Sequence, residues 1–305
     1  MGVRLGSLEL ANPIVTASGT FGHGAEVAHL CDPSRLGAVT AKSQAPFAWP
    51  GNASPRLHPA ACGMVNAVGL QGQGIEHWIN HDLPALRALG AVVIASIWGH
   101  GVDDFAQAAA LLVAVERDVA AVEINLSCPN VNGGNTIFAH DADATRQVVT
   151  AVIDAGVTVP VFAKLSAGVA DLPQIAGVAL EAGATGLTLI NTVRALLVDA
   201  ELRRPTLGSR GGGLSGSAIK PIALRAVFDV SQAHPGVPII GTGGVSTGTD
   251  AVEMLLAGAS AVGVGTATFA DPRAPIRVVT ELERWCADHG VARVADLTAS
   301  LGVET

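Results

Sequence analysis

Eight short runs of apolar, β-branched residues recur along this chain, and they limit its possible folds more than any other feature. They lie at residues 12–18, 37–42, 92–97, 121–125, 159–165, 186–191, 237–241 and 261–265. Longer Ala- and Leu-rich segments separate them, with apolar residues at helical spacing. The clearest are residues 103–118, 143–155, 172–182, 219–233 and 249–257. The chain therefore alternates predicted strands with predicted helices.

Strands that are apolar throughout are typical of a parallel sheet covered by helices on both faces. Eight strand–helix units indicate a closed (β/α)8 barrel. No linker, charge block or low-complexity stretch divides the sequence, so we expect one domain spanning residues 1–305. An open doubly wound sheet is the competing fold, but it binds its ligand at one switch point and does not need a polar residue at every strand end.

Composition excludes several classes of protein. Of the 305 residues, 49% are hydrophobic and 14% are charged, which indicates a well-buried chain and excludes a disordered one. The formal net charge of −8, with no runs of Lys or Arg, gives no electrostatic reason to bind nucleic acid. No apolar stretch reaches the roughly 20 residues of a membrane span. Residues 1–10 contain no secretory signal, and we expect a cytoplasmic protein.

The cysteines give no sign of a metal site. The chain has 4 Cys, which are scattered and lack the C-x-x-C spacing of zinc or iron–sulfur ligands. We therefore expect reduced thiols and no bound metal.

Polar or glycine residues stand at the end of each predicted strand. Because active sites of (β/α)8 barrels gather at the carboxyl ends of the strands, these residues predict one functional rim. Polar residues also end strands for purely structural reasons, so no single position by itself indicates a functional site. In chain order the strand-end residues are Ser18, Lys42, Ser96, Asn125, Lys164, Asn191, Gly243 with Gly244, and Gly265 with Thr266.

Glycine clusters follow the last two predicted strands, GTGGVSTG from Gly241 and VGVGTATF from Val262. Glycines let backbone N–H groups approach a phosphate, and barrels commonly bind phosphate after strands 7 and 8. The two clusters together therefore predict a phosphorylated ligand, although a glycine-rich turn alone is often only a turn. The segment GGGLSG at 211–216 is interpreted as a third, flexible loop that covers the same phosphate.

The segment EINLSCPN, from Glu123, places Cys128 just after the fourth predicted strand. Pro129 keeps the backbone of Cys128 extended, so the thiol is expected over the barrel mouth. A lone Cys is usually inert, but a well-positioned thiol can accept a proton.

Carboxamides offer donors and acceptors in one plane, which suits a uracil-like ring, although each Asn could equally form a turn or cap. The residues concerned are Asn66, Asn125, Asn130 and Asn191. Lys42 and Lys164 lie in apolar runs and need an anionic partner, such as a reduced flavin.

Seven segments together resemble the dihydroorotate dehydrogenases, in particular their class 1B catalytic subunits, in the expected order over nearly the whole chain. They are ASGTFG from Ala17, NAVGLQ from Asn66, EINLSCPN, INT from Ile190, GGLSGSAIKPIALR from Gly212, IIGTGG from Ile239 and MLLAGASAVGVGTA from Met254. The resemblance implies an FMN-dependent barrel that oxidises (S)-dihydroorotate to orotate in pyrimidine (UMP) biosynthesis.

The resemblance also implies roles for individual residues. Cys128 would be the general base that removes the C5 proton while a hydride leaves C6 for flavin N5. Substrate contacts would fall on Lys42, Asn66, Ala67, Val68, Gly69, Leu70, Asn125, Asn130, Asn191 and Thr192. FMN contacts would fall on Ser18, Lys42, Ser43, Ser96, Asn125, Lys164, Ile190, Gly216, Gly243, Gly244, Gly265 and Thr266.

Two segments depart from the family pattern. The third strand ends VIASIWG, with Ser96 and Trp98, where the family usually has Asn in a VIANVAG-like segment. The loop after Cys128 reads VNGGNTIF, where a basic residue and a His commonly precede the glycines. A paralogue acting on another dihydropyrimidine or a related ring is therefore the alternative function.

The chain shows no second nucleotide-binding unit and no clustered cysteines for an iron–sulfur relay. The resemblance implies a homodimer whose electrons reach NAD through a separate subunit carrying FAD and a [2Fe–2S] cluster. Two further alternatives remain open from the residues alone. One is a flavin-free, phosphate-binding barrel that uses Lys164 as a base or Schiff-base nucleophile, and the other is a flavin-binding barrel without this activity.

Overall fold

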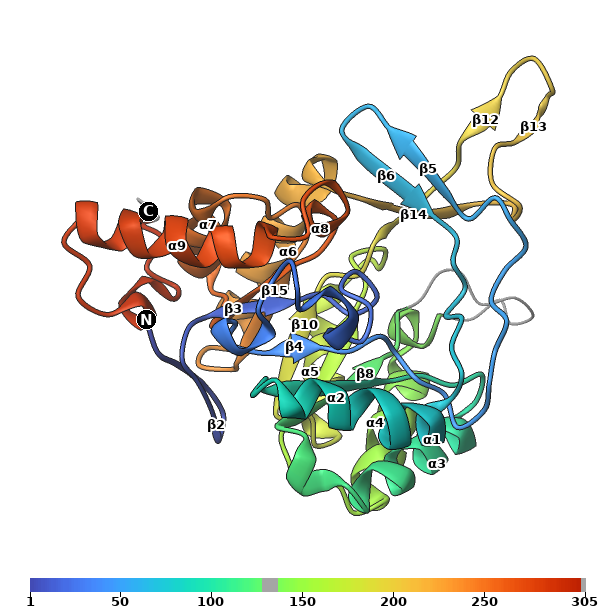
Figure 1. The fold of residues 1–305 in the computed structure, drawn as a ribbon, viewed down its shortest axis with the longest axis horizontal. Helices are drawn as coiled ribbons and strands as arrows, with labels where there is room; N and C mark the ends of the chain where they lie inside the picture. The colour runs from blue at the N-terminus through green and yellow to red at the C-terminus, as the bar shows by residue number, and fades with distance from the viewer. Residues whose placement is uncertain (128–136, 303–305) are drawn as a thin grey trace.

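The centre of the molecule is a sheet of eight parallel strands (Figure 1). The structure is a computed structural model that describes residues 1–127 and 137–302. The strand order is β3-β16-β15-β10-β9-β8-β7-β4. Each strand overlaps one of the eight predicted runs. Their bounds are β3 (Ile14–Thr16), β4 (Val39–Thr40), β7 (Val93–Ile97), β8 (Ala121–Asn125), β9 (Val161–Leu165), β10 (Gly186–Leu189), β15 (Ile239–Thr242) and β16 (Ala261–Val264).

The sheet closes on itself between its two outer members, β3 and β4. Val15 and Ala38 form an isolated parallel bridge there. The Thr16 amide donates to the Ala38 carbonyl at 3.2 Å, and the Gly37 amide donates to the Ile14 carbonyl at 2.8 Å. A Cβ on Gly37 would lie 2.1 Å from the Asn12 carbonyl oxygen, so glycine permits this close approach. The predicted (β/α)8 barrel is confirmed.

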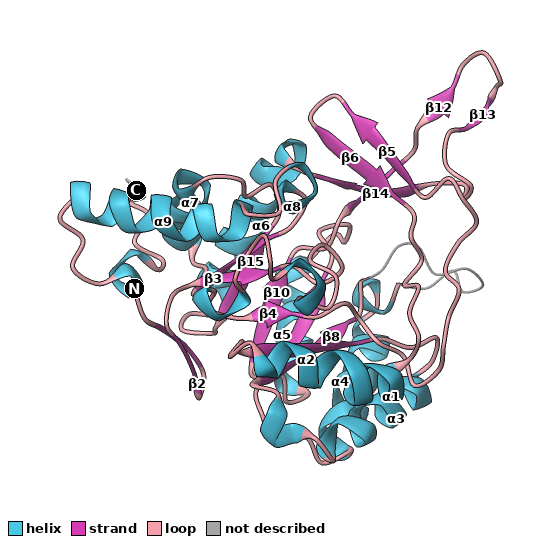
Figure 2. Cartoon of the chain, in the orientation of Figure 1, coloured by secondary structure: helices cyan, strands magenta, loops and turns pink. Residues whose placement is uncertain are grey.

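Helices surround the barrel (Figure 2). All five predicted helices are present, as α3 (Val102–Val113), α4 (Ala142–Asp154), α5 (Leu172–Glu181), α6 (Lys220–Ala233) and α7 (Gly248–Ala257). The structure adds α1 (Ile75–His77), α2 (Leu83–Ala88), α8 (Ala267–Ala270) and α9 (Ala274–Asp288). Side-chain caps fix several starts: Asp141 accepts from the Ala144 amide at 2.8 Å and begins α4.

A second sheet, which the sequence analysis did not predict, extends from the barrel at the upper right of Figure 1. It is antiparallel, with the order β11-β14-β6-β5. The bounds are β5 (Leu57–Ala60), β6 (Gly63–Asn66), β11 (Val193–Ala195) and β14 (Gly212–Ser215). The interpretation of 211–216 as a flexible loop is therefore wrong, because most of that segment is strand β14. A Cβ on Gly212 would lie 2.4 Å from the Asn66 carbonyl oxygen, so close strand approach explains this glycine.

Two small hairpins complete the fold. One pairs β1 (Val3–Leu5) with β2 (Leu8–Leu10), and the other pairs β12 (Val198–Asp199) with β13 (Arg204–Pro205). Within residues 1–127 and 137–302, none of the helices has both the length and the apolar character needed to cross a membrane.

Candidate active site

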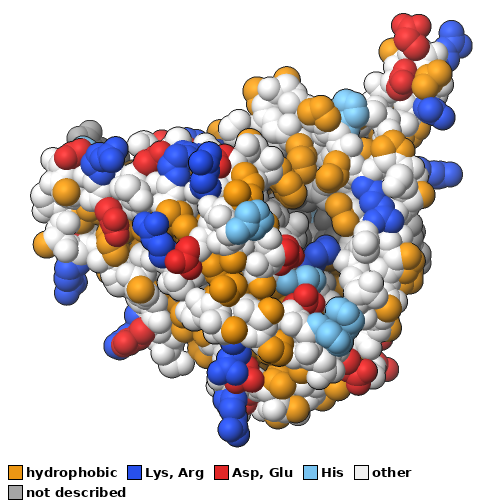
Figure 3. All heavy atoms as spheres, viewed as in Figure 1, with side chains coloured by type: hydrophobic (Ala, Val, Ile, Leu, Met, Phe, Trp, Pro, Cys, Tyr) orange, Lys and Arg blue, Asp and Glu red, His pale blue; other side chains and the backbone are white. Residues whose placement is uncertain are grey.

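A cavity of about 1020 Å³, counting the space open to solvent at its mouth, lies at the carboxyl ends of the barrel strands. Its floor and sides come from the barrel rim, and Met64, Asn66 and Ser215 reach it from the antiparallel sheet. The space-filling view in Figure 3 shows the molecule hollowed between the barrel body and that sheet. The position agrees with the rim that the strand-end residues predict.

Most of the residues predicted for the site line this one cavity. Cys128 and Asn130 lie outside the described residues. Of the others, Ser96 and Ala67 alone are not among the lining residues. The predicted residues that line it are Ser18, Lys42, Ser43, Asn66, Val68, Gly69, Leu70, Asn125, Lys164, Ile190, Asn191, Thr192, Gly216, Gly243, Gly244, Gly265 and Thr266.

Ser96 and Ala67 lie behind the cavity wall. Ser96 is 2% exposed, and its hydroxyl lies 2.9 Å from the Ser43 hydroxyl. Ala67 is fully buried in a small apolar cluster with Val65 and Leu207. Both can act on a ligand only through the residues in front of them.

Trp98, the bulky departure from the family pattern, also stays out of the cavity. Its ring packs edge-on against Phe47, Trp49 and His100, with centroid distances of 5.7, 6.3 and 5.0 Å. The replacement therefore fills an aromatic cluster and does not narrow the ligand space.

One corner of the cavity, which we call the glycine corner, is formed by Gly243 and Gly244 after β15 and by Gly265 and Thr266 after β16. Among the hydrogen bonds of the described residues, none is donated by the backbone N–H groups of Gly243, Gly244, Gly265 or Thr266. Gly244 has φ +77°, and a Cβ there would lie 2.6 Å from Cβ of Lys220. These free amides, two of them on glycine backbone with positive φ, form a cradle for an anionic group. These residues fit a phosphate.

Asp250 stabilises the loop that continues from the glycine corner through hydrogen bonds to residues just after it. Its carboxylate accepts hydrogen bonds from the amides of Ser246 and Thr247, both at 2.9 Å, and from Lys220 Nζ at 2.6 Å. Burial disfavours the charged form of Asp250, but hydrogen bonds from Lys220, Ser246 and Thr247 outweigh it and lower its pKa to about 2. The carboxylate stays ionised and ties the loop to the starts of α6 and α7.

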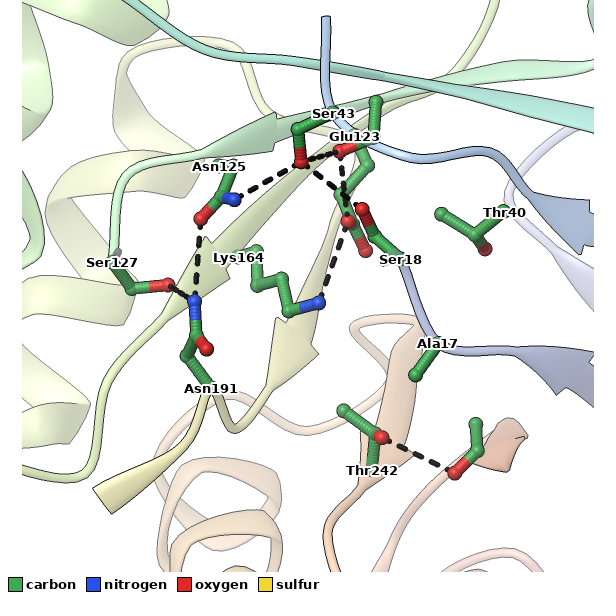
Figure 4. Close-up of polar contacts among 12 residues, drawn as sticks. Ala17, Ser18, Thr40, Ser43, Glu123, Asn125, Ser127, Lys164, Asn191 and Thr242 are labelled. Carbon is green, nitrogen blue, oxygen red and sulfur yellow. Dashed lines mark hydrogen bonds and ion pairs between the residues drawn. The ribbon is translucent and has the colours of Figure 1, made fainter. Parts of the chain in front are cut away.

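The opposite side of the cavity carries a row of carboxamides (Figure 4). The Thr192 amide donates to Asn191 Oδ1 at 2.7 Å, which turns Asn191 Nδ2 toward Asn125 Oδ1 (3.3 Å) and Ser127 Oγ (3.0 Å). Asn125 Nδ2 then donates to Ser43 Oγ at 3.0 Å. Within the described residues this is the one hydrogen bond that Asn125 Nδ2 donates, and a carboxamide has two N–H groups, so the second is available to a ligand.

Lys164 reaches the cavity floor from β9 and is 5% exposed. The expectation that it needs an anion is met within the chain, because its Nζ lies 3.6 Å from Oε1 of Glu123. Glu123 was not predicted for the site, although a charged residue inside an apolar strand is the same signal that singled out Lys164. Lys42 also lines the cavity, two residues beyond β4.

Apolar side chains close the cavity on its outer side. Leu57 and Met64 come from β5 and β6, Ile219 precedes α6, and Phe269 lies on α8. None of the four was predicted from the sequence, since isolated apolar residues in short strands and short helices give no functional signal. They add a nonpolar wall suited to a flat ring system.

The fold and this cavity define a (β/α)8 barrel protein with a ligand site at the carboxyl ends of its strands. It offers an anion cradle at one end and a cationic, carboxamide-lined floor at the other. Within the described residues, no group of three His, Cys, Asp or Glu side chains is arranged to hold a metal ion.

Sequence comparison gives the family. The family model for dihydroorotate dehydrogenase matches residues 1–285, so the chain belongs to the dihydroorotate dehydrogenase family of oxidoreductases. This family is flavin-dependent in general. One relative, "Dihydroorotate dehydrogenase B (NAD(+)), catalytic subunit" of Geobacter sulfurreducens, is 43% identical over 99% of this chain and 98% of its own. The protein of the same description from Pelobacter propionicus is 44% identical, with the same coverage.

Solved structures of the family share the fold. A crystal structure of DHODH from Eimeria tenella in complex with ferulenol superposes with a TM-score of 0.80 at 26% identity, covering 98% of this chain and 88% of that one. The ligand-free structure from the same organism gives a TM-score of 0.81 at 26% identity, covering 99% and 92%.

Proposed function

We propose that this protein catalyses the FMN-dependent oxidation of (S)-dihydroorotate to orotate in pyrimidine biosynthesis. The observation that carries the proposal is the joining, in one cavity, of free glycine amides with a lysine- and carboxamide-lined floor. Family membership and the names of the full-length relatives support the same reaction.

Each part of the cavity suits one part of FMN. The amides of Gly243, Gly244, Gly265 and Thr266 would hold the phosphate. Along the rest of the cavity the ring system would lie on polar and apolar lining residues, and when bound it would accept the hydride from C6 of dihydroorotate. The lining residues proposed for the ring are Ser18, Lys42, Ser43, Asn125, Lys164, Ile190 and Gly216.

The substrate ring would bind against the carboxamides. The carboxamides of Asn66, Asn125 and Asn191 line this side of the cavity. Groups of this kind can match the alternating C=O and N–H groups of dihydroorotate, and the ammonium of Lys42 suits its carboxylate. The segment 67–70 and Thr192 complete this side of the cavity. The segment is held by a hydrogen bond from Asn52 Nδ2 to the Ala67 carbonyl at 3.0 Å.

We assign the proton transfer to Cys128, which lies outside the described residues, as does the further proposed contact Asn130. A thiolate close to C5 would accept the proton from that carbon.

The electrons must leave after each turnover. The relatives are named as the catalytic subunits of NAD(+) enzymes. We infer that this chain forms a homodimer and passes electrons to NAD through a second subunit that carries FAD and a [2Fe–2S] cluster.

Turnover with an artificial dye tests the proposed reaction without any partner. The FMN-loaded protein is incubated with dihydroorotate and the dye, and the product is identified by chromatography against orotate. Dihydrouracil, which lacks the carboxylate, is the matched control. We expect orotate from the first and no oxidised product from the second. Oxidation of dihydrouracil alone would support the paralogue, and oxidation of neither would contradict the proposal.

A further inference from the structure

A line of hydroxyl groups runs from the cavity into the barrel interior (Figure 4). Ser18 Oγ lies 3.0 Å from Ser43 Oγ, and Ser43 Oγ lies 2.9 Å from Ser96 Oγ. Ser96 Oγ then donates to Oε1 of Glu123 at 3.1 Å. Ser18 lines the cavity, whereas Ser96 and Glu123 are each 2% exposed and lie behind it. The line therefore connects the ligand space to a buried carboxylate.

The number of hydrogens available fixes which hydroxyl is the donor in each of these hydrogen bonds. A serine hydroxyl has one hydrogen, and a carboxylate can only accept. Ser96 donates its one hydrogen to Glu123, so in the contact between Ser43 and Ser96 the donor must be Ser43. Ser43 has then no hydrogen left, so Ser18 must donate to Ser43. Asn125 Nδ2 donates to the same Ser43 oxygen at 3.0 Å and completes its bonding.

The direction of the line decides what the cavity offers to a ligand. Ser18 turns its hydrogen inward and presents only lone pairs to the cavity. The same Oε1 of Glu123 holds Lys164 Nζ at 3.6 Å, so the ammonium stays at the floor as a donor. A ligand ring therefore meets an acceptor at Ser18 and a positively charged donor at Lys164.

We propose that Ser96 and Glu123 are positioning residues that fix Ser18 as the acceptor for an N–H group of the flavin ring. The proposal rests on the proposed function, in which the cavity holds FMN. Neither residue lines the cavity, so Ser96 acts through the hydroxyls of Ser43 and Ser18, and Glu123 acts through the same hydroxyls and through Lys164.

Removing the Ser96 hydroxyl releases this constraint. In Ser96→Ala the Ser43 hydrogen loses its acceptor and can turn to Ser18, which frees the Ser18 hydrogen to point at the ligand. The Ser18 hydroxyl would then point its hydrogen at the flavin N–H group, which is also a donor. We expect FMN to bind about tenfold more weakly, as expected for one lost hydrogen bond of this kind. Ser96→Thr keeps the hydroxyl, and we expect its FMN affinity to stay within about twofold of the unaltered protein.

A double-mutant cycle separates positioning from a general structural effect. Dissociation constants for FMN are measured by fluorescence titration of the apoprotein for Ser18→Ala, Ser96→Ala and the double variant. We expect the Ser96→Ala effect to fall from about tenfold to less than about twofold once Ser18 is Ala, because the two side chains act through one bond to FMN. Equal effects in both backgrounds, or no effect in either, would overturn the proposal.

Thr188→Val is the matched control. Thr188 is a barrel-strand residue that is 2% exposed, and its hydroxyl has no partner among the described residues. We expect no change in FMN affinity in either background. Loss of affinity in Ser96→Thr equal to that in Ser96→Ala would also count against the proposal.

The cycle also distinguishes this proposal from the function on which it rests. If the unaltered protein does not bind FMN, the proposed function fails and the positioning role fails with it. If the unaltered protein binds FMN and the cycle shows no coupling, the positioning role alone fails. Binding, unlike turnover, does not depend on the substrate or on an electron acceptor.

Discussion

Nζ of Lys164 lies 3.6 Å from Oε1 of Glu123, and the two side chains are 6% and 3% exposed. The pair joins neighbouring strands β9 and β8 inside the barrel. It places a positive charge at the cavity floor, and the carboxylate offsets part of the cost of burying that charge.

The first prediction follows from this pair. Lys164→Met leaves the Glu123 carboxylate buried without its cation, and removing one partner of a buried pair typically costs about 3 kcal/mol or more. We expect that loss in the free energy of unfolding, measured by urea titration. The double variant Lys164→Met with Glu123→Gln should recover most of it, because no unpaired charge remains. A single variant as stable as the unaltered protein would contradict the importance of the pair.

The second prediction concerns the glycine corner. Gly244→Ala places a methyl group 2.6 Å from Cβ and 2.9 Å from Cα of Lys220, so the loop must move away from the phosphate position. We expect FMN affinity to fall more than about tenfold in a fluorescence titration.

Gly236→Ala is the control for Gly244→Ala. Gly236 has φ +82°, so it shares the conformational cost, but a Cβ there meets nothing within 4 Å. We expect it to lose some stability and no FMN affinity. Equal affinities for the two variants would show that the glycine corner does not hold the phosphate.

The third prediction is a pH dependence of stability. The folded-state pKa of Asp250 lies near 2, below its ordinary value of 3.8. Its stabilising contribution is therefore complete above about pH 4 and is lost as the pH falls toward 2, and it amounts to about 2 kcal/mol. Asp250→Asn should destabilise the protein by that amount at pH 7 and by much less near pH 2.

Urea unfolding at the two pH values checks this dependence. Asp229→Asn is the control, because Asp229 pairs with the exposed Arg225 and should contribute little at either pH. A pH-independent effect of Asp250→Asn would contradict the role given to its charge.

The fourth prediction concerns the proposed base. Cys128→Ala should retain FMN and slow the reduction of the flavin by dihydroorotate about 100-fold or more, the usual scale for loss of a general base. Rapid mixing under anaerobic conditions measures the rate. Reduction at the unaltered rate would remove Cys128 from the mechanism.

Much of the barrel could be predicted from the sequence, because each strand is covered on both faces and so is apolar along its length. The runs at 93–97 and 161–165 carry this signal clearly. The antiparallel sheet could not be predicted, since its strands are short, partly exposed and paired over long sequence distances. Gly213 pairs with Asn66, which no local pattern reveals.

Part of the candidate site could likewise be predicted from the sequence, and part could not. Lys42, Lys164 and the glycine clusters stood out because charged or glycine residues at strand ends are conspicuous. The direction of hydrogen bonding from Ser18 to Glu123 depends on three-dimensional proximity between strands, so it could not be predicted. Ser96 was expected to contact the cofactor, whereas the structure places its hydroxyl between Ser43 and Glu123.

Anaerobic reduction of the flavin by dihydroorotate tests the central claim most directly. The FMN-loaded protein is mixed with dihydroorotate in the absence of oxygen and of any other acceptor, and the visible flavin absorbance is followed. The account predicts complete bleaching with formation of one orotate for each flavin. Flavin absorbance that stays unchanged at saturating dihydroorotate would contradict it.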